Sequence, residues 1–134
     1  MSIVKGFDIL GSGMSAQRTR LNTVSSNLAN AETTRTAEGG PYARRVPVFE
    51  AIEEGEAGAG VRVSNIETDP VPGPMVYDPG HPDAGPDGYV KMPNVNVVEE
   101  MVDMMTAARS FEANVQAFQT LRDMVQQAMN LGKG

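Results

Sequence analysis

The chain has 134 residues, a mass of 14.3 kDa and a formal net charge of −6, with 40% apolar and 5% aromatic residues. This length fits one small domain, and the negative charge disfavours binding to the phosphate backbone of nucleic acids. The absence of cysteine excludes disulfides, thiolate chemistry and cysteine-ligated metals. No apolar run approaches the roughly 20 residues of a membrane span, and the first residues lack the apolar core of a cleavable secretion signal.

The helix breakers divide the chain into three parts. All nine prolines fall between Pro41 and Pro93, whereas residues 14–38 and 94–131 contain neither proline nor glycine. We therefore predict an N-terminal helix within 1–31, a central extended segment in 32–93 with a proline-rich loop, and a C-terminal helix within 94–134. The predicted fold class is α+β, in which the two long helices pair as a coiled-coil-like hairpin beside a small, irregular β-rich centre.

Both ends carry apolar residues at the three- and four-residue spacing of an amphipathic helix. At 1.5 Å per residue, the predicted helices from Val4 to Ala31 and from Val97 to Leu131 are roughly 40 and 50 Å long. We expect the centre to be too short to cover them, so the pattern predicts a multimer; the alternative is a methionine-rich helix folded into its own core. The residues that we assign to the subunit interface are Phe7, Leu10, Met14, Leu21, Val24, Leu28, Met101, Met104, Ala108, Phe111, Val115, Phe118 and Val125.

The centre predicts two short pairs of strands. The first pair lies around Val46 to Ile52 and around Val61 and Val63, and the second is formed by residues 75–77 and 89–92. Residues 78–88 contain three prolines, which fix the backbone and remove hydrogen-bond donors, so we predict a rigid external loop. Two roles remain open for this loop: an arm that docks on a neighbouring subunit, or a solvent loop without a partner.

The reactive side chains do not form a site with recognisable catalytic or metal-binding spacing. Three aspartates around His81 have neither the spacing of a calcium loop nor enough histidines for zinc, so we interpret His81 as a hydrogen-bonding turn residue. Residues 11–16 have the glycine spacing of a dinucleotide loop, but no alternating strands and helices surround them. No serine or threonine has a plausible histidine base. We therefore predict no catalytic residue, cofactor or metal, and interpret these acidic residues as solvated: Glu53, Glu54, Glu56, Glu99 and Glu100.

A motif at the end of the first predicted helix resembles a known signature. Residues 25–36 read Ser-Ser-Asn-Leu-Ala-Asn-Ala-Glu-Thr-Thr-Arg-Thr, which is similar to the N-terminal signature of bacterial flagellar rod and hook proteins. The signature residues are Ser26, Asn27, Leu28, Ala29, Asn30 and Thr33. Six further segments resemble, in order, the proximal rod members of that family: residues 38–42, 76–83, 88–90, 93–96, 100–104 and 109–115. Two roles remain open for Asn27 and Asn30: they satisfy backbone groups where the helix ends, or they are merely tolerated polar positions.

The resemblance implies a non-enzymatic structural subunit of the flagellar basal-body rod. Its terminal helices would form a tube around the export channel, and its centre would lie outside against neighbouring subunits. The implied partners are the chain itself, FlgB-type and FlgF-type rod proteins, a FliE-type adaptor next to the MS ring, and the flagellar type III export apparatus, with no nucleic acid and no membrane span. The implied location is the rod crossing the periplasm, reached without a cleavable signal peptide. The alternative class is a cytoplasmic coiled-coil adaptor or export chaperone.

Overall fold

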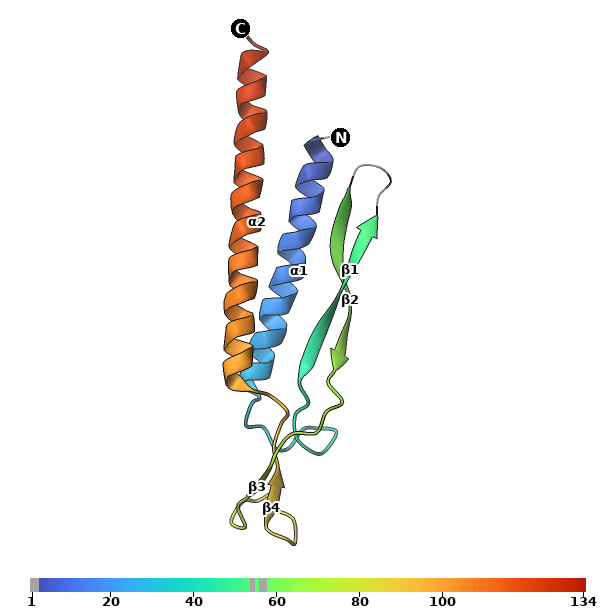
Figure 1. The fold of residues 1–134 in the computed structure, drawn as a ribbon, viewed down its shortest axis with the longest axis vertical. Coiled ribbons are helices and arrows are strands. Elements are labelled where there is room, and N and C mark those ends of the chain that lie inside the picture. The colour runs from blue at the N-terminus through green and yellow to red at the C-terminus, as the bar shows by residue number, and fades with distance from the viewer. Residues whose placement is uncertain (1–2, 54, 56–57) are drawn as a thin grey trace.

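Two helices of unequal length form an antiparallel pair, with two small sheets between them in sequence (Figure 1). The computed structural model describes residues 3–53, 55 and 58–134, so Glu54 and Glu56 lie outside the described residues. The elements follow the order α1 (Ile3–Ala29), β1 (Arg45–Glu53), β2 (Ala59–Thr68), β3 (Met75–Tyr77), β4 (Tyr89–Lys91) and α2 (Val97–Leu131). The predicted α+β class with paired terminal helices is confirmed.

Polar side chains fix the helix ends that lie nearest the centre of the chain. Asn96 begins α2, because its side-chain oxygen accepts the N–H groups of Val98 at 3.1 Å and Glu99 at 3.3 Å. At the end of α1, the Asn30 amide donates to the Ser26 carbonyl at 2.9 Å. The first of the two roles considered for Asn30, satisfying a backbone group there, is confirmed, although α1 ends at Ala29, two residues earlier than expected.

Small residues let the two helices approach closely. A Cβ atom built on Gly13 would lie 3.1 Å from the Asn114 side chain, and Ala107 of α2 is completely buried. Further along the pair, the rings of Phe7 and Phe118 meet edge to face with centroids 4.8 Å apart. The last turns of α2 continue past the beginning of α1 (Figure 1).

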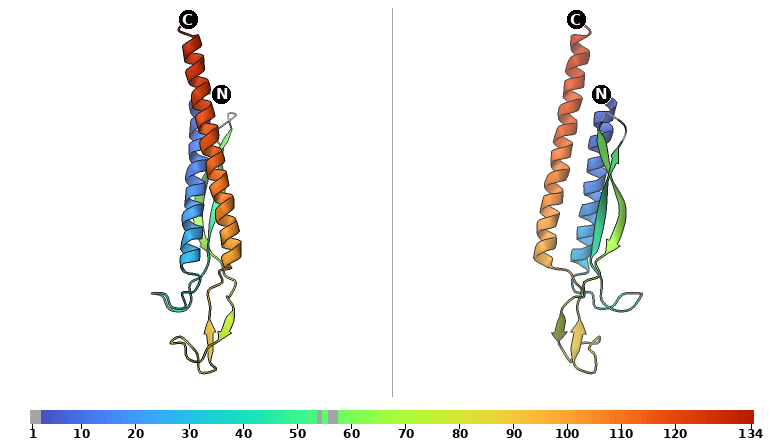
Figure 2. Two further views of the ribbon diagram at one scale, coloured as in Figure 1. Left: turned by 90° about the vertical axis from the view of Figure 1, so that its left-hand side faces the viewer. Right: turned by 45° about the vertical axis from the view of Figure 1, so that its right-hand side comes forward.

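The β1–β2 hairpin lies along α1, on the flank away from α2 (Figures 1 and 2). Its antiparallel register runs from Arg45 opposite Thr68 to Glu53 opposite Ala59, with an irregularity after Val48. The hairpin is tied to the helix because the Val61 N–H donates to the Ser12 hydroxyl at 3.0 Å. The predicted strand pair is confirmed, but the expectation that the centre cannot cover the helices is wrong for this flank of α1.

The β3–β4 hairpin projects from the end opposite both termini (Figure 1). It confirms the second predicted strand pair, and the rings of Tyr77 and Tyr89 pack edge to face across it at 5.3 Å. In the connecting loop, His81 Nδ1 accepts the Asp83 N–H at 3.0 Å, which confirms His81 as a turn residue. The Asp83 carboxylate accepts the Thr34 hydroxyl at 2.7 Å, so within one chain the loop docks on the segment that follows α1.

The molecule has a large surface and a very small core. Its accessible surface is 9101 Å², whereas a compact monomer of this mass has about 6,800 Å². Among the described residues, the buried apolar side chains are Ala16, Val24, Tyr42, Val90, Pro93 and Ala107. A single chain therefore leaves much of its apolar surface in water.

Candidate assembly interface

The predicted interface residues lie along the helix pair but are only partly covered within one chain. In α1, Val24 is buried and the other five are half-buried. In α2, Met101 is 54% exposed and points outside the contact with α1, whereas the others are half-buried. The half-buried residues are Phe7, Leu10, Met14, Leu21, Leu28, Met104, Ala108, Phe111, Val115, Phe118 and Val125.

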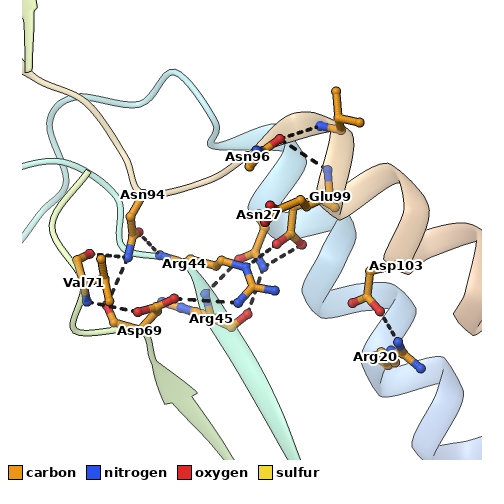
Figure 3. Close-up of polar contacts among 12 residues, drawn as sticks. Arg20, Asn27, Arg44, Arg45, Asp69, Val71, Asn94, Asn96, Glu99 and Asp103 are labelled. Atoms are coloured by element: carbon orange, nitrogen blue, oxygen red, sulfur yellow. Dashed lines mark hydrogen bonds and ion pairs between the residues drawn. The ribbon is translucent and has the colours of Figure 1, made fainter. Parts of the chain in front are cut away.

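A cluster of polar residues, here called the basal cluster, joins the three parts of the chain where the helices meet the centre (Figure 3). It consists of Asn27 from α1, Arg44 and Asp69 from the centre, Asn94 from the segment that leads into α2, and Glu100 from α2. Asn27 and Glu100 are each only 1% exposed. Such buried polar groups persist only when they are hydrogen-bonded.

Asn27 satisfies the hydrogen-bonding capacity of its side-chain amide inside this cluster. Its Nδ2 donates to the Arg45 carbonyl at 2.9 Å and to Glu100 at 3.1 Å. Its Oδ1 accepts the Arg45 N–H at 3.0 Å and the Tyr42 hydroxyl at 2.8 Å. The first of the two roles considered for Asn27, satisfying the end of its own helix, is wrong, because its side chain instead holds the start of β1 against α1.

Glu100 forms an ion pair with Arg44. The pKa of the Arg44 guanidinium is raised, chiefly because it donates a hydrogen bond to Glu100, with the charges of Glu100 and Asp69 adding to the effect. The interpretation of Glu100 as a solvated carboxylate is wrong, because its side chain is buried and bonded to Asn27 and Arg44. Both partners lie far from Glu100 in the sequence, so the residues next to Glu100 do not reveal them. The sequence offers one indication that the two residues matter: Asn27 and Glu100 both lie in segments that resemble flagellar rod proteins.

The centre holds the cluster from the other side. Asn94 Oδ1 accepts the Arg44 N–H at 2.7 Å, and Asn94 Nδ2 donates to the carbonyls of Asp69 at 3.1 Å and Val71 at 2.7 Å. Arg44 also lies 3.8 Å from the Asp69 carboxylate. Beside the cluster, Arg20 of α1 pairs with Asp103 of α2. The segment leading to the β3–β4 hairpin is thereby fixed to the base of both helices.

Two further patterns in the sequence, the glycine spacing of residues 11–16 and the clusters of acidic residues, can now be compared with the structure. Residues 11–16 lie inside α1 and follow no strand, which is not the geometry of a dinucleotide loop. Within residues 3–53, 55 and 58–134, no group of three or more His, Cys, Asp or Glu side chains is placed to hold a metal ion. Neither helix, in the part of the chain that the structure describes, combines the length and hydrophobicity needed to cross a bilayer.

Comparisons with known proteins place these helices in a family. Residues 7–35 match the family model described as "Flagella basal body rod protein", and residues 87–131 match "Flagellar basal body rod FlgEFG protein C-terminal". The first match covers most of α1 and the signature, and the second covers β4, the cap and α2. An extended molecule with paired terminal helices and these matches belongs to the class of flagellar basal-body rod proteins.

Whole-chain relatives narrow the class further. The chain is 47% identical over 134 residues to the flagellar basal-body rod protein FlgC of Aquifex aeolicus, covering 99% of each chain. It is 42% identical to FlgC of Salmonella typhimurium and 39% identical to FlgC of Bacillus subtilis, in each case with 99% of this chain and all of the relative covered. The chain therefore belongs to the FlgC family.

Family membership settles the broad function. The chain is a structural subunit of the flagellar basal-body rod, and it assembles with other flagellar rod proteins in the basal body. It belongs to a family of structural proteins and not to one of enzymes. The alternative of a cytoplasmic adaptor or export chaperone is not favoured.

Proposed function

We propose that the chain polymerises through its two terminal helices into the rod that surrounds the export channel. The observation that carries this proposal is the surface of about a third more than a compact monomer of this mass exposes. Buried apolar surface contributes about 25 cal/mol per Å², so covering the exposed parts of both helices favours association.

In this proposal the three parts of the chain have different roles. Residues 1–31 and 94–134 form the inner tube, and residues 32–93 lie outside it against neighbouring subunits. The thirteen assigned interface residues act both within and between subunits, since most are only half covered in one chain. The signature residues Ser26, Asn27, Leu28, Ala29, Asn30 and Thr33 fix the turn by which the chain leaves α1, as the bonds of Asn27 and Asn30 support.

The proposed neighbours are further copies of the chain, FlgB-type and FlgF-type rod proteins, and a FliE-type adaptor next to the MS ring. The proposed route is export by the flagellar type III apparatus without removal of a signal peptide, into a rod that crosses the periplasm. The family membership of the chain supports this route.

Charged substitutions in the interface test polymerisation. Phe111→Asp and Leu21→Asp place an unpaired charge among apolar side chains, and we expect each to reduce incorporation into basal bodies at least tenfold while the exported amount stays unchanged. Because Phe111 and Leu21 also pack within the chain, Met101→Asp separates assembly from folding: Met101 is exposed in one chain and belongs to the proposed interface. Gln119→Asp, at an exposed polar position, is the control. Normal rods built from all three interface variants contradict the proposal.

Fractionation separates a rod subunit from a soluble adaptor. A rod subunit remains with the basal body through detergent and high salt, because its apolar contacts are not screened by ions. An adaptor or chaperone is recovered in the soluble fraction under the same conditions. Recovery of most of the chain in the soluble fraction of motile cells contradicts the proposed role.

A further inference from the structure

The first turns of α2 are apolar on the side that faces away from α1. Five residues there are 46–69% exposed, although Ala107 on the opposite side is fully buried against α1. These five residues, here called the base patch, are Val97, Val98, Met101, Val102 and Met105. An apolar face of a helix is normally covered by another element, so the base patch lacks its partner in the single chain.

A second apolar surface lies further along the same helix. It is a shallow groove between the helices, here called the upper groove, and Gln116 and Thr120 are its polar members. Its apolar lining comes from Leu10 of α1 and from Ala113, Ala117, Leu121 and Met124 of α2. Between the two surfaces, the exposed side chains of Arg109 and Glu112 interrupt the apolar character. The helix therefore presents two separate apolar surfaces.

The two surfaces are complementary in shape and chemistry. The base patch offers branched and flexible side chains that protrude, and methionine adapts to irregular surroundings. The upper groove has alanine at two positions, which leaves room for such side chains as the hole does for a knob in a coiled coil. Two base patches would complement each other less well, because protruding side chains would then face one another.

We propose that the base patch of one copy docks in the upper groove of a second copy, with the two α2 helices parallel and shifted along their axes. This inference rests on the proposed function, namely that the chain polymerises through its helices. The centres of the two surfaces are about 17 residues apart, which sets an axial shift of about 25 Å. At 3.6 residues per turn they face directions roughly a quarter of a turn apart, so each copy is also rotated relative to the last.

The proposed contact is head to tail. A parallel, shifted contact leaves one surface free on each outer copy and therefore continues into an open helical series. An antiparallel pair would instead satisfy both surfaces at once and close as a dimer. Cross-linking can distinguish the two arrangements because the chain contains no cysteine, so introduced thiols have no competitors.

The test uses the full chain carrying Met101→Cys and Ala117→Cys, mildly oxidised at a concentration where it associates. We expect a ladder of dimers, trimers and larger products under non-reducing conditions, and monomer after reduction. The matched control is Met101→Cys with Glu112→Cys, whose second thiol lies on the same helix outside the groove; we expect at least tenfold less product. The proposal is overturned if the products are limited to dimers, or if the control variant gives an equal ladder. It is also overturned if Met101→Cys alone gives as much dimer as the double variant.

A second measurement does not depend on cross-linking. Val102→Asp changes an exposed base-patch residue, and we expect its sedimentation to show at least tenfold weaker self-association. Gln119→Asp, at an exposed position of the same helix outside both surfaces, is the control and leaves association unchanged. Equal association of both variants overturns the proposal. If basal bodies incorporate the cysteine variants but oxidation joins the base patch to another rod protein or to nothing, the polymerisation function stands and this head-to-tail contact fails.

Discussion

The carboxylate of Glu100 occupies a place where an unpaired charge is costly. Its charge is balanced by Arg44 from the centre, and its second oxygen accepts the Asn27 amide from α1. Glu100 and these two partners come from three different parts of the chain. Burial of this carboxylate at the base of the helix pair therefore requires the segment that contains Arg44. The centre is in this way coupled to both helices.

Glu100→Gln tests how much this ion pair contributes to the free energy of unfolding. The substitution keeps the shape but removes the charge, and it leaves Arg44 with the more distant Asp69. Because Arg44 is partly exposed, we expect the free energy of unfolding to fall by about 2–3 kcal/mol, below the usual cost of breaking a fully buried pair. Asp103→Asn is the control, since its pair with Arg20 is more exposed and contributes about 1 kcal/mol or less. Urea unfolding at fixed protein concentration measures both; equal losses would contradict the assignment.

The docking of the proline-rich loop is expected to depend on pH. The pKa of Asp83 is lowered, first by the hydrogen bond from Thr34 and then by Arg35. A lowered folded-state pKa means that this docking is fully present above the ordinary aspartate pKa of about 3.9 and is lost as the pH falls through the lower folded value. An NMR titration of the Asp83 and Thr34 amides should show this transition, and Asp83→Asn should remove it. An Asp83 pKa at or above the ordinary value would contradict the docking.

At the scale of the elements, the glycines of α1 differ in what surrounds them. A Cβ atom on Gly11 would meet nothing within 4 Å, whereas on Gly13 it would lie 3.1 Å from Asn114 and on Gly6 it would lie 3.0 Å from Leu121. Gly6 and Gly13 therefore serve the close approach of α2. Gly11 serves no contact within the chain and only weakens the helix.

Alanine substitutions should separate these two cases. Gly11→Ala is expected to stabilise the chain by up to about 1 kcal/mol, because alanine is the better helix former and the new methyl group is unopposed. At Gly13 the same gain is offset by the crowding of Asn114, so we expect Gly13→Ala to gain clearly less or to destabilise. Thermal unfolding of both variants at one concentration measures the difference. An equal gain at both positions would show that the helices are not closely packed at Gly13.

The elements themselves could be predicted from the sequence, but their cross-links could not. The expected bounds of α2, Val97 to Leu131, agree with the structure because an unbroken helical period runs between a capping asparagine and a glycine. The strands follow from apolar alternation between turn residues. The pairing of Glu100 with Arg44, by contrast, joins residues 56 positions apart and leaves no periodic trace. The bond from Val61 to Ser12 is unpredictable for the same reason.

At the scale of the whole molecule, the chain behaves as a component of a larger body. Its shape is set by a helix pair, a hairpin along one flank and a second hairpin at the far end (Figure 2). None of these layers encloses the others, so the exposed apolar residues occur along the entire length of the molecule, from Val76 at one end to Leu131 at the other. Covering such surfaces on a single chain would need more sequence than it has, whereas neighbouring subunits can cover them.

The overhanging end of α2 gives the last prediction. Met129 is 60% and Leu131 is 83% exposed, and the aromatic contact of the pair lies earlier, at Phe118. Replacing both with glutamine should leave the unfolding of the single chain unchanged within about 0.5 kcal/mol, as for other exposed positions. If neighbours bury both side chains, association should weaken by about 2–3 kcal/mol, and incorporation into basal bodies should fall. Circular dichroism and sedimentation measure the two quantities, with Gln126→Ser and Gln127→Ser as the matched control. Unchanged association would mean that this end of α2 stays in water in the assembled rod.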